Sequence, residues 1–71
     1  MDLEAELVRW MDEHEAEMLD LLREEEGRFL ALHPGVDPVE SRVHIAAMAN
    51  RRFIARALGA VLPRYLQAVH Q

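Results

Sequence analysis

A proline–glycine interruption near the middle of the chain constrains its fold more than any other feature. The segment 33–37 (His-Pro-Gly-Val-Asp) separates two stretches in which apolar residues recur every three or four positions, as on one face of a helix. Proline and glycine interrupt helices, so this segment is predicted to be a loop. After it, Asp37 suits a helix N-cap, Pro38 the first helical position and Glu40 the capping-box position.

The stretch before the loop predicts one continuous helix over residues 3–32. No proline lies within it, and its apolar side chains keep the helical period. Gly27 is its weak point, because glycine inside a helix costs about 1 kcal/mol relative to alanine. We therefore expect any bend or early end of this helix near Gly27. The apolar positions are Leu3, Leu7, Met11, Met18, Leu21, Leu22, Phe29 and Leu32, with Trp10 beside them.

The stretch after the loop predicts a second helix over residues 38–62. Pro63 would clash with the carbonyl group four residues earlier, at Gly59. Residues 63–70 are therefore expected to continue after a kink or as a separate short helix. The side chains expected to face the first helix are Val39, Val43, Ala46, Ala47, Ile54, Ala57, Leu58 and Val61, continuing to Tyr65 and Ala68.

Two long helices joined by a short loop form an antiparallel hairpin, and no alternating pattern predicts a strand. Residues 1–71 are therefore expected to form a single all-α domain. A chain of 71 residues builds only a small core, and without cysteine it has no disulfide to stabilise that core. Ile45, Met48, Leu62 and Leu66 also lie outside the stripe that faces the first helix. We expect two copies to cover this surface by pairing as a two-fold homodimer, which is a four-helix bundle.

Charge divides the chain into an acidic half and a basic half. Residues 1–30 hold eleven acids and three arginines (−8), and residues 31–71 hold two acids and five arginines (+3), which gives the net charge of −5. Two partners would explain this division, but packing of the acidic half against the basic half is the simpler explanation. Either the outer charged faces are solvated, or the arginines pair with acids of a second copy or of another protein. An aromatic residue among arginines is typical of an interface centre. The residues predicted to contact a second copy are Trp10, Met11, His14, Met18, Ile45, Met48, Arg52, Phe53, Arg56, Leu62 and Leu66.

Three polar residues, His14, Glu25 and Asn50, fall among apolar residues at the helical period. A buried polar group needs a hydrogen-bond partner, so we expect Glu25 and Asn50 to be core polar residues that meet across the hairpin. Arg51 or Arg42 would close this network, and such a pair would fix the register of the two helices. A partly exposed Glu25 and a ligand-binding role are the alternatives. His14 is expected to be a core or interface imidazole.

A metal site is the second hypothesis. Di-iron helical bundles use inward carboxylates with a Glu-x-x-His motif, and here Glu40 and His44 are four residues apart on one helical face. Glu25 of the first helix would approach them near the loop. The spacing departs from the di-iron motif, so the alternative function is a metal- or ligand-binding bundle that uses Glu25, Glu40 and His44, with catalysis at that site as its extension.

Other function classes find little support. Ser41 is the only serine, there is no threonine or cysteine, and the three glycines are isolated, so the sequence predicts no enzyme and no cofactor. The net charge of −5 disfavours nucleic-acid binding, although an acidic inhibitor or nucleic-acid mimic remains a third alternative. The chain opens with acidic residues and has no long apolar run, so we expect a cytoplasmic protein without a membrane segment. The leading hypothesis is an adaptor, regulator or accessory subunit that acts through protein contacts.

Overall fold

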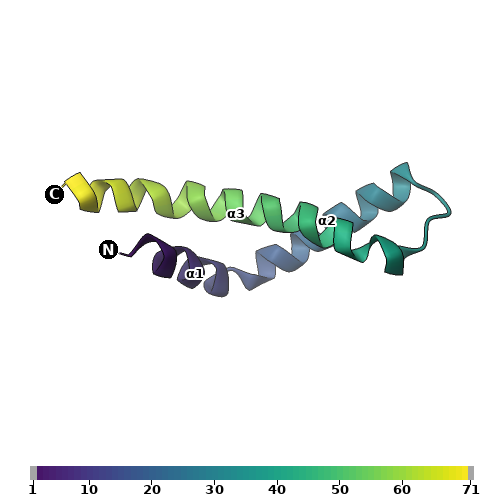
Figure 1. The fold of residues 1–71 in the computed structure, drawn as a ribbon, viewed down its shortest axis with the longest axis horizontal. Coiled ribbons are helices and arrows are strands. Elements are labelled where there is room, and N and C mark those ends of the chain that lie inside the picture. The colour runs from purple at the N-terminus through teal and green to yellow at the C-terminus, as the bar shows by residue number, and fades with distance from the viewer. Residues whose placement is uncertain (1, 71) are drawn as a thin grey trace.

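The computed structural model describes residues 2–70, which form three helices and no strand. They are α1 (Leu3–Glu13), α2 (Glu15–Leu32) and α3 (Pro38–His70). The all-α class predicted from the sequence is therefore confirmed. α3 runs back along α2 and then along α1, and both contact it (Figure 1). The molecule is a rod of 54 × 17 × 15 Å.

The turn between α2 and α3 depends on one glycine. Gly35 has φ +88°, in the left-handed region that residues with a side chain rarely adopt. Asp37 then begins α3, because its Oδ1 accepts a hydrogen bond from the amide of Val39 at 2.9 Å. The Ser41 hydroxyl donates to the carbonyl oxygen of Asp37 at 3.0 Å, and this satisfies a buried serine.

The prediction of one continuous helix over residues 3–32 is wrong, because the arm breaks at His14 and not at Gly27. The backbone of His14 (φ −114°, ψ 28°) ends α1, and its amide donates to the carbonyls of Trp10 and Met11. The imidazole Nδ1 lies 2.7 Å from the Trp10 carbonyl oxygen, which accepts a hydrogen bond from it. Such local side-chain bonds compete with the helical ladder. Gly27 lies inside α2 without a break.

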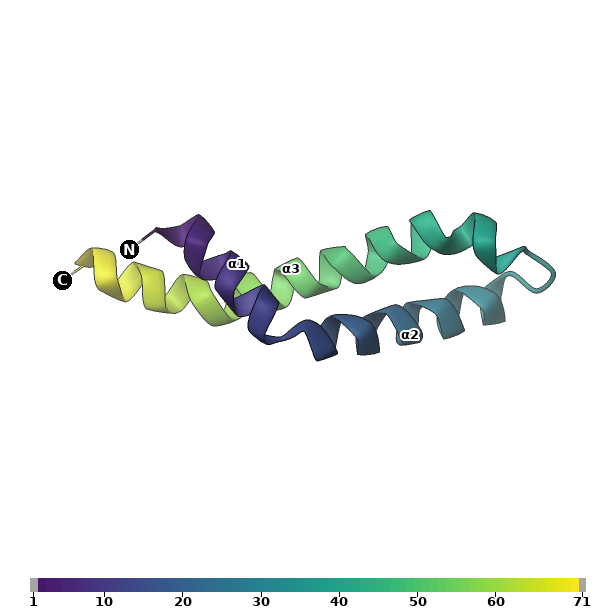
Figure 2. The same ribbon diagram turned by 90° about the horizontal axis from the view of Figure 1, so that it is seen from below.

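α3 packs through every fourth residue along its length. Four residues turn a helix about 40° beyond a full turn, so this row winds around α3. α2 covers the N-terminal part of α3 and α1 the C-terminal part, and Figure 2 shows the arm changing direction between the two. Because the chain changes direction at His14, both α1 and α2 can pack on this row as it winds around α3. The buried residues of the row are Ser41, Ile45, Ala49, Phe53, Ala57 and Val61.

The predicted packing face of α3 is therefore largely wrong. Val39, Val43 and Ile54, expected to face the first helix, are 62 %, 81 % and 40 % exposed. Ile45 and Phe53, expected to contact a second copy, are instead buried within the chain. A stripe drawn at 3.6 residues per turn combines residues from several rows of four-residue spacing. The helices instead pack along one such row.

Of the two alternatives for residues 63–70, a kink or a separate helix, the separate helix is wrong, because α3 continues through Pro63 to His70. Pro63 leaves the carbonyl of Gly59 without its helical hydrogen bond. Both residues are exposed, so water can bond this carbonyl instead. Beyond the proline, Tyr65 is half-buried on the winding row. This packing favours continued helix at the end of the chain.

Candidate functional site

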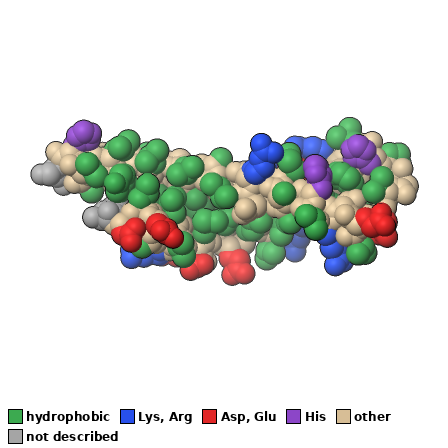
Figure 3. Space-filling view, viewed as in Figure 1, with side chains coloured by type: hydrophobic (Ala, Val, Ile, Leu, Met, Phe, Trp, Pro, Cys, Tyr) green, Lys and Arg blue, Asp and Glu red, His purple; other side chains and the backbone are tan. Residues whose placement is uncertain are grey.

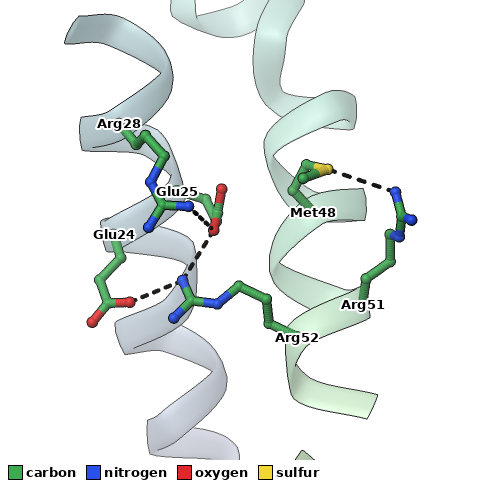
Figure 4. Close-up of polar contacts among 6 residues, drawn as sticks. All are labelled: Glu24, Glu25, Arg28, Met48, Arg51 and Arg52. Carbon is green, nitrogen blue, oxygen red and sulfur yellow. Dashed lines mark hydrogen bonds and ion pairs between the residues drawn. The ribbon is translucent and has the colours of Figure 1, made fainter. Parts of the chain in front are cut away.

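The most unusual side chain in the molecule is a buried carboxylate. Glu25 of α2 is only 5 % exposed. Its Oε1 accepts a hydrogen bond from Arg52 Nη1 at 2.9 Å and a longer one from Arg28 Nη1 at 3.4 Å (Figure 4). A buried charge without a partner is strongly destabilising, so these arginines are what allow a carboxylate here.

Arg52 joins α3 to two consecutive acids of α2. The same Nη1 lies 2.9 Å from Glu25 Oε1 and 3.0 Å from Glu24 Oε2 (Figure 4). These hydrogen bonds, with Glu25 first and then Glu24, raise the pKa of the Arg52 guanidinium above its ordinary value. Arg52 is about one-third exposed and Glu24 lies in solvent, so the second pair contributes less than the first.

Asn50 is exposed, so the prediction that it is a core polar residue paired with Glu25 is wrong. Arg52 takes its place because Arg52 lies on the side of the winding row that faces α2. The guanidinium of Arg51 instead lies 3.9 Å from the sulfur of Met48 on its own helix. The signal that the sequence analysis missed is the four-residue row Glu40, His44, Met48, Arg52, Arg56, which borders the buried row.

Arg56, the second arginine of this row, also pairs with an acid of its own chain. Arg56 Nη1 lies 3.7 Å from Glu17 Oε1, and both side chains are partly exposed. The other carboxylate oxygen of Glu17 is shielded from solvent and has no hydrogen-bond partner among the described residues. Arg52 and Arg56, predicted to contact a second copy, therefore already pair with the acidic helix of their own chain.

The structure brings together only two of the predicted metal ligands, because Glu25 and His44 line one pocket and Glu40 does not line it. The Glu25 carboxylate already accepts hydrogen bonds from two arginines. Glu40 is exposed in the first turn of α3. The His44 ring packs against the Phe29 ring, with the ring centroids 5.3 Å apart. Within residues 2–70 no group of three or more His, Asp or Glu side chains has an arrangement that could hold a metal ion. The site predicted from Glu25, Glu40 and His44 is not present.

The aromatic and methionine residues predicted at the contact mostly build the small core. Trp10 stacks on His14 with ring centroids 3.9 Å apart, and its ring also lies 5.5 Å from that of Phe53. Met11 and Met18 pack around the same core, which consists of Leu21, Ala49 and Phe53. His14 is half-buried and its bonding partner belongs to its own chain.

Much of α3 is left exposed beside and opposite its contacts with α1 and α2, and the apolar part of this surface forms a band. Two neighbouring four-residue rows form this apolar band, and Arg42, Asn50 and Arg51 are its polar members. Figure 3 shows hydrophobic side chains gathered along the C-terminal half of α3. Leu62 and Leu66, which were predicted at the contact, lie in the band and are 37 % and 47 % exposed. Its apolar members are Val39, Val43, Ala46, Ala47, Ile54, Ala55, Leu58, Gly59, Leu62, Pro63 and Leu66.

Comparison with known proteins gives no relative: no protein-family model, no curated protein and no solved structure matches the chain. Over residues 2–70, the three helices are too short or too polar to cross a bilayer.

Proposed function

We propose that this chain is a small non-enzymatic protein that self-associates and acts through protein contacts, as an adaptor, regulator or accessory subunit. In this proposal α1 and α2 form one arm of an antiparallel hairpin, α3 forms the other, and two copies pair into a four-helix bundle. The exposure of the apolar band is the observation that carries it. The leucines and valines of the band's two rows are between 37 % and 81 % exposed, which favours a binding surface over a solvated one.

The surface area of the molecule supports the same proposal. The chain exposes 5312 Å², whereas a compact monomer of this mass exposes about 4,500 Å². The surplus of about 800 Å² equals what one partner buries in a standard protein interface. The radius of gyration of 15.4 Å also exceeds the about 11 Å expected for a compact domain of this length.

The charged side chains are less suited to be the main contact. Arg52, Arg56 and Arg28 already bond acids of α2, so a partner would have to compete with these pairs. Among residues 2–70, the leucines and valines of the apolar band stay between 37 % and 81 % exposed. We therefore place the contact on the band and leave the arginine row to hold the hairpin together.

Sedimentation equilibrium over a concentration series tests the proposal. The mass should approach twice 8.2 kDa as the protein concentration rises. A mass that stays at that of one chain up to about 100 µM, a concentration at which a micromolar dimer is fully formed, would contradict self-association.

A further inference from the structure

The apolar band contains a ridge of large side chains beside a groove of small ones. The ridge is Ile54, Leu58, Leu62 and Leu66, and the groove on the next row is Ala55, Gly59 and Pro63. Helices pack by fitting the ridges of one into the grooves of the other. Because this face of α3 carries both, a two-fold related copy offers each ridge a groove and each groove a ridge.

Nothing packed against Gly59 among the described residues requires a glycine there, although its carbonyl is the one that Pro63 leaves without a helical partner. Its backbone is not in the left-handed region, where Gly35 is the only glycine, and a Cβ at Gly59 would meet no atom within 4 Å. Glycine in a helix interior is less stable than alanine, so the position is costly to α3 itself. Small residues four apart, such as Ala55 and Gly59, allow two helix backbones to approach closely, as they do between membrane helices.

We propose that Ala55 and Gly59 form the centre of a two-fold contact between the α3 helices of two copies. Leu58 and Leu62 of each copy then pack against Ala55 and Gly59 of the other. This inference rests on the proposed self-association and names its surface. A second copy fits better than another protein because the face is complementary to itself and the surplus surface of one chain matches half of a standard interface.

The one charge beside this centre fixes the direction of the pair. Arg51 lies on the groove row, two turns before Gly59. Two parallel α3 helices would bring the two Arg51 side chains together, whereas an antiparallel pair centred at residue 57 separates them by about 18 Å along the axis. Like charges in contact cost free energy, so the helices are antiparallel in this dimer.

A pair of glycine variants tests the contact in the full chain. In Gly59→Leu the new side chain would fill the groove, and we expect sedimentation equilibrium to give a Kd raised by at least about tenfold, as overpacking of a close contact predicts. Gly27→Leu is the matched control, since Gly27 is also exposed, helical and without a neighbour within 4 Å. It should leave the Kd unchanged. A Cβ at either position meets no atom within 4 Å among the described residues, and circular dichroism should show that both variants remain helical.

A disulfide trap provides an independent readout, because the chain has no cysteine of its own. Leu58→Cys, next to the proposed axis, should form covalent dimers on mild oxidation, and Leu32→Cys at the far end of α2 should not. If the native chain dimerises but Gly59→Leu keeps its affinity and Leu58→Cys does not cross-link, this contact is wrong and self-association stands. If the native chain is monomeric at about 100 µM, the proposed function fails as well.

Discussion

Glu25 and Arg52 show how strongly a single buried charge in this protein depends on one partner. The Glu25 carboxylate is almost fully buried, and Arg52 provides its short hydrogen bond from the facing helix. Arg28, the second donor, is exposed and 3.4 Å away. The stability of the hairpin should therefore be more sensitive to Arg52 than to any other arginine.

Replacing Arg52 with alanine should lower the free energy of unfolding by about 1–3 kcal/mol, because it leaves Glu25 with one weak partner. Urea denaturation measures this difference. Arg23→Ala is the matched control, since Arg23 is exposed and lies 3.9 Å from Asp20 of its own helix, and it should change stability by less than about 0.5 kcal/mol. Equal effects of the two variants would show that the ion pair does not stabilise the fold.

The contribution of Arg52 should not change between pH 7 and pH 10. Its hydrogen bonds to Glu25 and Glu24 raise its pKa above the ordinary value, so the group is charged in both the folded and the unfolded chain over this range. Stabilisation by a group with a raised pKa is present below its unfolded pKa and is lost only as the pH rises through the folded one. The difference in unfolding free energy between the native chain and Arg52→Ala should be equal at both pH values. A difference that shrinks by pH 10 would contradict this.

At the scale of helices, the position of each element was easier to predict than the face by which it packs. Proline and glycine act locally, so the loop at 33–37 and the start of α3 at Asp37 could be located from the residues alone. The break at His14 could not be predicted from the apolar pattern, because it combines a side-chain hydrogen bond to the Trp10 carbonyl with packing along the row that winds around α3. At Pro63 a separate helix was expected, whereas α3 continues and Tyr65 is half-buried beyond the proline.

The candidate site, like the helices, was predicted in position but not in its packing partner. A buried Glu25 was predicted from its place among apolar residues, and the structure confirms its burial. Its partner was predicted as Asn50 instead of Arg52, because a helical wheel of 3.6 residues per turn does not tell which four-residue row meets α2. The two residues differ by only two positions, yet one is exposed and the other bonds the buried carboxylate.

Alanine substitutions at Gly27, inside α2, and at Gly35, in the turn, should change the free energy of unfolding in opposite directions. Gly27→Ala should raise the free energy of unfolding by about 0.5–1 kcal/mol, because α2 gains helix propensity and the new Cβ meets no atom. Gly35→Ala should lower it by about 1 kcal/mol or more, because Gly35 has φ +88°. Thermal or urea unfolding of the two single variants checks the signs. Stabilisation by Gly35→Ala would mean that the turn does not hold this conformation.

At the scale of the whole molecule, the chain is a thin rod whose core is a short cluster around Phe53. A rod 17 Å by 15 Å in cross-section has too little interior to bury the apolar residues that its sequence supplies. Most of the large apolar side chains that stay exposed lie on α3, and this is why we propose a binding surface there.

The start of α1 and the end of α3 lie at the same end of the rod, with the loop at the other (Figures 1 and 2). In an antiparallel pair centred at residue 57, the C-terminus of one copy and the N-terminus of the other are then about 40 Å apart along the axis. Two copies fused in tandem through fewer than about ten residues cannot close on each other, since an extended residue spans at most about 3.5 Å. Such a fusion should polymerise, whereas a linker of about thirty residues should give a closed single chain. Light scattering on the two fusions would measure the direction of pairing without any change to the surface itself.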